Sequence, residues 1–219
     1  MALHPEGMFT TGPIAHLVGL AAGGTDPLEW EVLRFGRVTR TEYWDPAWRV
    51  TPQHLASQLD YLSTVFGEFG EGFLDTCPEA DRRTWRTAAG TQGIPAFMTG
   101  LATLLRLADR QGDAAYEDVP LAAWEVRARF PLLLSLDDWA YDGEYASYEE
   151  SLRAFVEGEH PYCSYEVMPR LHQALAARML CAESAAFAAS FRVLAPQATP
   201  ETLEVLARTT LTHMTEQHV

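Results

Sequence analysis

Apolar residues recur at intervals of three and four along most of the chain, and this spacing limits the folds that it can adopt. One stretch places Leu55, Leu59, Leu62 and Phe66 in a single stripe on a helix, because an α-helix completes a turn in about 3.6 residues. Alternating runs of apolar and polar residues, which would indicate strands, are scarce. We therefore predict an all-α fold, a single domain over residues 1–219 that forms a bundle of about eight or nine helices.

Caps and prolines set the expected helix boundaries. Thr51 is the expected N-cap of a helix that starts at Pro52, and Asp26 is expected to cap an earlier helix. Pro131 predicts a break near residues 129–130, because proline removes a backbone donor and crowds the preceding turn. The pattern predicts helices over residues 26–40, 51–66, 78–85, 95–110, 147–157, 166–194 and 199–215.

The charge balance excludes several classes of function. The net charge of −14 disfavours nucleic acid as a partner, because phosphate binding depends on cationic contacts. All 16 basic side chains are arginine, so Schiff-base lysine chemistry and a lysine-containing phosphate loop are excluded. The sequence contains no asparagine and no GxSxG motif, and we predict no catalytic residue.

Cysteine usage and hydropathy indicate a cytoplasmic protein. Cys77, Cys163 and Cys181 are odd in number and have no CxxC spacing, which suits a reducing compartment rather than a disulfide framework. No basic residue precedes the short apolar run near the start, so a secretory signal is not expected. No window approaches the roughly 20 apolar residues that span a bilayer, so we predict no membrane partner.

Weak candidates for metal ligands lie on two expected helices. His172 and Glu183 fall among apolar residues of the longest helix, where a buried polar group needs a partner. Glu157 and His160 form an ExxH spacing like that of di-iron bundles, although Gly158 within it predicts a helix end instead.

A third weak candidate is an acidic run. Asp138 and Asp142 lie one turn apart in a segment that resembles the aspartate-rich metal motif of isoprenoid cyclases, and carboxylates of this kind hold Mg²⁺. The sequence lacks that family's second metal motif, and an exposed acidic helix end accounts for the same residues. The metal ligands therefore stay open, and we predict no cofactor, with a divalent metal as the alternative.

A basic protein or peptide is the partner that suits this acidic chain, because complementary charge speeds and orients encounter. Trp44 and Trp48 lie beside Asp45 and form a candidate anchor, since aromatic residues dominate binding hot spots, with aromatic packing at a helix entry as the alternative. His54 and the preceding Gln53 lie in the first turn of a helix and are further candidates for partner contacts, with capping or packing as the alternative.

One segment resembles a known family of chaperones. Pro52-Gln53-His54-Leu55-Ala56, Phe73-Leu74, Trp85 and the run from Phe97 to Leu105 are similar to segments of TorD/NarJ-type proteins. The resemblance covers residues of about 50–107, has Gln53 in place of the family's aspartate and differs in the order of segments. It implies an all-helical cytoplasmic chaperone that binds arginine-containing signal peptides of molybdenum enzymes.

The sequence thus favours an acidic helical binding protein, chaperone-like, that recognises a basic or arginine-containing segment. Two alternatives stay open. One is a metal-dependent helical-bundle enzyme with an interior carboxylate and histidine site. The other is an immunity-type inhibitor of a basic toxin.

Overall fold

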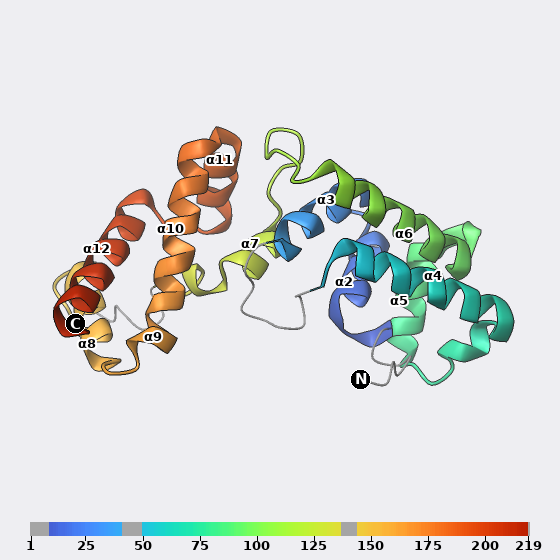
Figure 1. The fold of residues 1–219 in the computed structure, drawn as a ribbon, viewed down its shortest axis with the longest axis horizontal. Coiled ribbons are helices and arrows are strands. Elements are labelled where there is room, and N and C mark those ends of the chain that lie inside the picture. Colours follow the sequence, from blue (N-terminus) through green and yellow to red (C-terminus); the bar gives the residue numbers. More distant parts are fainter. Residues whose placement is uncertain (1–8, 41–49, 137–143, 219) are drawn as a thin grey trace. The chain divides into compact units, whose positions relative to one another are not determined.

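Helices form every regular element that the structure describes (Figure 1). It is a computed structural model, and it describes residues 9–40, 50–136 and 144–218. No strand occurs within those ranges, so the predicted all-α class is confirmed. By internal packing the chain divides into two compact units, residues 1–114 and 115–219, and each unit is described by itself below. The expectation of one domain stays a prediction.

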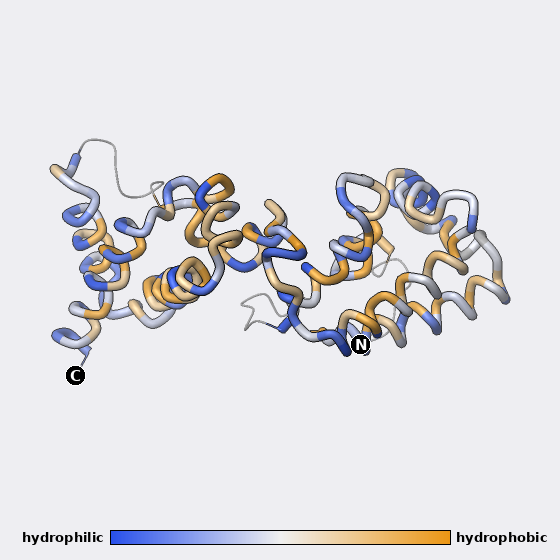
Figure 2. Tube along the Cα trace, turned by 90° about the horizontal axis from the view of Figure 1, so that it is seen from above, coloured by the Kyte–Doolittle hydropathy of each residue, from blue (hydrophilic) through white to orange (hydrophobic). Residues whose placement is uncertain are grey.

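The first unit contains five α-helices within its described residues. In Figure 2 apolar and polar stretches alternate along the helices, because an amphipathic helix brings apolar residues back to the same side in each turn. The predicted stripe Leu55, Leu59, Leu62 and Phe66 is fully buried, which confirms it. The elements are α2 (Gly12–Gly23), α3 (Leu28–Thr39), α4 (Pro52–Phe69), η2 (Glu71–Leu74), α5 (Glu79–Ala89), η3 (Gly90–Gln92) and α6 (Ile94–Gln111).

Aromatic rings fill the centre of the first unit. The Trp85 side chain is buried, and its indole N–H donates to the Phe9 carbonyl at 3.0 Å. The ring centroid of Trp85 lies 5.0 Å from that of Phe9 and 6.4 Å from that of Phe97, both edge to face. These contacts tie the segment before α2 to α5 and α6, since edge-to-face pairs add to the energy of buried area.

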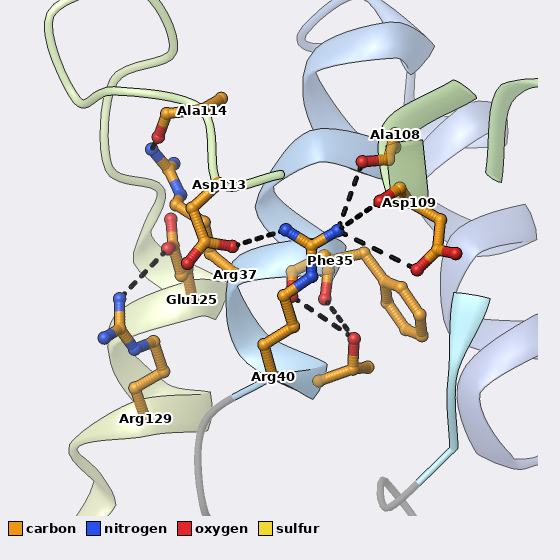
Figure 3. A network of polar contacts seen from close by, with 11 residues as sticks. Phe35, Arg37, Arg40, Ala108, Asp109, Asp113, Ala114, Glu125 and Arg129 are labelled. Atoms are coloured by element: carbon orange, nitrogen blue, oxygen red, sulfur yellow. Dashed lines mark hydrogen bonds and ion pairs between the residues drawn. The ribbon is translucent and has the colours of Figure 1, made fainter. Parts of the chain in front are cut away.

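Two arginines, Arg34 and Arg40, connect α3 to neighbouring segments of the first unit through hydrogen bonds. Arg40 donates to the Ala108 carbonyl at 3.2 Å, to the Asp109 carbonyl at 3.1 Å and to the Asp113 carboxylate at 2.9 Å (Figure 3). The expectation that Asp26 caps this helix was wrong. Its carboxylate instead accepts a hydrogen bond from buried Arg34 at 2.7 Å, because a buried guanidinium needs a charged partner.

The second unit begins with short elements and ends in longer helices. The break predicted near residues 129–130 is confirmed, since α7 ends at Arg129 and a 3₁₀ turn starts at Pro131. The elements are α7 (Ala123–Arg129), η4 (Pro131–Leu133), α8 (Tyr148–Gly158), α9 (Cys163–Glu166), α10 (Met168–Glu183), α11 (Ala185–Leu194) and α12 (Pro200–Gln217).

Phenylalanines form the centre of the second unit. The rings of Phe187 and Phe191 are stacked, with their centroids 5.2 Å apart. The ring of Phe130 contacts that of Phe191 edge to face, with a centroid distance of 5.3 Å. On α10 the buried side consists of Leu171, Ala174 and Ala177, and the small side chains of the two alanines permit close helix packing. The core therefore lies against a narrow, small-residue face of α10.

The uninterrupted helix predicted over residues 166–194 was wrong. Ser184 breaks it, because its backbone is extended and its hydroxyl accepts a hydrogen bond from the Phe187 backbone N–H at 3.0 Å, which caps α11. This break, and α2 at residues 12–23 where no helix was expected, give the described residues more α-helical segments than the predicted eight or nine.

Candidate metal centre

Four potential metal ligands converge where the turn after α8 meets the last turns of α12. The ligand atoms of His160, Cys163, His213 and His218 all lie within 4.8 Å of one another. Imidazole nitrogen and thiolate sulfur are ligands that zinc prefers. Among the described residues this donor set is buried at Cys163, partly buried at His213 and exposed at the other two histidines.

The turn after α8 places the first two donors. The Tyr162 backbone N–H donates to the Glu159 carbonyl at 2.6 Å, and α9 starts at the next residue, Cys163. The Cys163 thiol is fully buried beside the Val156 carbonyl, at 3.8 Å between sulfur and oxygen. This tight turn brings His160 and Cys163, three residues apart, to the same place.

The last turns of α12 supply the other two donors. Thr199 caps the helix by accepting a backbone hydrogen bond in its first turn, and Leu203 and Leu206 are buried in the core. The helix packs against α8 and α10. Its last turns carry His213, and His218 follows at the C-cap.

Two of the distances between donors are close to the edges of a tetrahedral zinc site. His160 Nδ1 lies 3.3 Å from His218 Nε2, and Cys163 Sγ lies 3.3 Å from His213 Nε2. Zinc bonds of about 2.0–2.1 Å to nitrogen and 2.3 Å to sulfur give tetrahedral edges of about 3.3 Å between nitrogens and about 3.6 Å between nitrogen and sulfur. The four donor atoms lie within 4.8 Å of one another, so the remaining pairs have to move closer when the set surrounds an ion.

The environment of His213 favours the form that binds metals. Burial lowers the pKa of His213 from its ordinary value, and the neighbouring imidazoles of His218 and His160 lower it further. The carboxylates of Glu157 and Glu216 act in the opposite direction. A lowered pKa leaves the imidazole neutral at neutral pH, and a neutral imidazole is the metal ligand.

A pocket of about 490 Å³ lies beside these donors, with walls from α8 and α12. His160 and His213 form part of its lining. Farther along, the Glu149 carboxylate accepts hydrogen bonds from Arg208 at 2.9 Å and from Arg153 at 3.3 Å. The pocket thus has two guanidinium groups in one part and two of the four donors, His160 and His213, in another.

The structure places the predicted metal candidates separately. His160 belongs to the donor cluster, whereas His172 and Glu183 are exposed on α10. The interior position expected for His172 and Glu183 was wrong, because α10 buries its alanine side instead. The helix end predicted within the ExxH spacing is confirmed, since α8 ends at Gly158. Asp138 and Asp142 lie outside the described residues.

The residues predicted to contact a partner also fall into two groups. Trp44, Asp45 and Trp48 lie outside the described residues. Gln53 and His54 are exposed in the first turn of α4, where the His54 imidazole contacts the Gln58 amide at 2.9 Å. Their role in partner binding stays a prediction.

Three donors of the cluster were missed by the sequence analysis. Two local spacings carried a signal: His160 and Cys163 are an HxxC pair, and His213 and His218 are separated by four residues. Nothing in the sequence states that the two pairs meet, because their convergence depends on the packing of α12 against α8.

Comparisons with known proteins identify no family for this chain. No family model, no curated protein and no solved structure matches this chain. The chaperone resemblance therefore stays a prediction. Among the described residues, no helix combines the length and apolar character needed to cross a lipid bilayer.

Proposed function

We propose that the second unit binds one zinc ion, or a similar divalent transition metal, through His160, Cys163, His213 and His218. The observation that carries this proposal is the convergence of three imidazoles and one thiol within 4.8 Å. Nitrogen and sulfur ligands favour zinc over magnesium and calcium, which take oxygen ligands.

The ligand count supports a structural ion. Four protein ligands fill a tetrahedron, whereas catalytic zinc sites keep one position for water or substrate. The ion would tie the turn after α8 to the end of α12. Because unfolded chains rarely present a preformed site, the free energy of binding adds to the free energy of folding. The proposed function is therefore that of a metal-dependent helical module, whose folding depends on how much metal is available.

Zinc titration of chelator-treated protein tests this proposal. We expect one zinc per chain by elemental analysis after gel filtration. At free zinc a hundredfold above Kd the metal adds about 2.7 kcal/mol to the free energy of unfolding. For a unit of this size, that gain corresponds to a rise in melting temperature of roughly 10 °C or more.

Ligand variants make the test specific. H213A and H218A should each lose stoichiometric zinc and the zinc-dependent rise in melting temperature. H172A is the matched control, because His172 is exposed on α10 of the same unit and lies outside the cluster. Cobalt loading adds a direct readout, since the cobalt–thiolate absorption should be absent in C163S. Unchanged zinc content in H213A and H218A would contradict the proposal.

A further inference from the structure

We propose that the groove between α8 and α12 is a binding site for a small molecule that carries a carboxylate or phosphate group, with Arg153 and Arg208 as its anchors. This inference rests on the proposed function, because the metal sets the charge of the groove. It adds a ligand and its chemical class to a site that would otherwise be only structural.

Side chains one turn apart line the groove on both helices. Glu149, Arg153 and Glu157 follow one another at intervals of four on α8, and Arg208, Thr212 and Glu216 do the same on α12. Contacts at both ends of the groove show that α8 and α12 run in the same direction. Glu149, near the start of α8, contacts Arg208 at 2.9 Å, and His160, which follows α8, lies beside His213 and His218 at the end of α12. Eight residues at 1.5 Å each give the groove a length of about 12 Å.

The arginine part of the groove has unused capacity for an oxyanion. Arg153 and Arg208 share the single carboxylate of Glu149, each through one NH2 group, and both arginine side chains are 56% exposed. A guanidinium has five N–H donors in a planar fork that matches carboxylate and phosphate oxygens. Two guanidinium groups against one carboxylate leave an excess positive charge there.

The other part of the groove is acidic until a metal is bound. Glu157 and Glu216 line the pocket beside His213, so three carboxylates face two guanidinium groups and the metal-free pocket has one excess negative charge. A divalent ion held by one thiolate and three neutral imidazoles adds one positive charge and cancels this excess. Metal loading should therefore strengthen the binding of an anion in the groove.

The dimensions fit a small molecule rather than a macromolecule. The pocket volume of about 490 Å³ falls in the range of about 300–1,000 Å³ that is typical of small-molecule sites. A ligand with its oxyanion group on Arg153 and Arg208 would extend toward His160 and His213, which face the same pocket.

Calorimetric titration of the zinc-loaded protein tests the inference, with inorganic phosphate and succinate as separate probes. We expect at least one probe to bind, and its Kd to weaken by on the order of tenfold in R153Q and in R208Q, because each loses charge-assisted hydrogen bonds. The probe that binds distinguishes phosphate from carboxylate recognition. R208K should retain part of the affinity, since it keeps the charge but loses the fork.

R178Q is the matched control, because Arg178 lies on α10 of the same unit, is 40% exposed and pairs with Glu204 away from the groove. Zinc content is measured on every preparation. Protein that binds no zinc overturns the proposed function together with this inference. Protein that binds zinc but neither probe at millimolar concentration overturns this inference alone. So does binding that R153Q and R208Q leave unchanged, or that the metal-free protein shows at full strength.

Discussion

The His16 imidazole is partly buried in α2, and this burial lowers its pKa below the ordinary value of 6.5. Below pH 6.5 the unfolded chain takes up a proton at this position that the folded chain resists. The free energy of unfolding of the first unit should therefore fall as the pH decreases through this range. At higher pH the imidazole is neutral in both the folded and the unfolded state, so His16 contributes no pH dependence to the free energy of unfolding.

Replacing His16 with glutamine should remove this contribution. We expect H16Q to lose less stability than the wild type when urea unfolding is compared above and below pH 6.5. Tryptophan fluorescence reports the transition, because Trp85 is buried in the same unit. An equal loss of stability in both proteins would rule out His16 as a source of acid sensitivity.

At the scale of elements, Ser184 decides where α10 stops and α11 starts. Its hydroxyl caps α11 at Phe187 and also donates to the Glu117 carboxylate at 2.7 Å. This second hydrogen bond is the largest cause of the lowered pKa of Glu117. One hydroxyl therefore both ends a helix and fixes a side chain from a distant part of the chain.

The S184A variant should reduce the free energy of unfolding by about 0.5–2 kcal/mol, which is the range for a lost N-cap. It should also raise the pKa of Glu117 toward its ordinary value, which carboxyl NMR shifts can follow. S190A is the control, because Ser190 lies inside the same helix and not at its cap. Equal free energies of unfolding for S184A and S190A would show that the Ser184 cap does not stabilise the junction between α10 and α11.

The ends of elements differ in how far sequence could predict them. Thr51 was identified as a cap because its signal is local: the hydroxyl accepts from the His54 backbone N–H three residues later, at 3.1 Å. Ser184 lies among alanines and apolar residues that extend the helical pattern, and its bond to Glu117 spans 67 residues. The donor cluster has the same property, since the HxxC pair is local and its meeting with His213 is tertiary.

At the scale of the whole molecule, the net charge of −14 predicts that binding of the proposed basic partner would depend on salt. We expect a labelled arginine-containing peptide to bind at low ionic strength and to lose affinity steeply as salt is raised, because screening shortens the range of charge attraction. Fluorescence anisotropy across a salt series measures this dependence. A peptide with glutamine in place of arginine is the control, and binding that ignores salt would contradict a charge-driven partner.

The buried position of Trp85 gives this protein an optical reporter, read as the difference between the wild-type and W85F spectra because the sequence has six tryptophans. An indole shielded from water, with its N–H bound to the Phe9 carbonyl, should emit toward the blue end of the tryptophan range. Detachment of the segment before α2 would expose the ring and shift its emission to the red. Cobalt absorption would report the ion in the second unit, so two colours could follow two parts of one chain in the same cuvette.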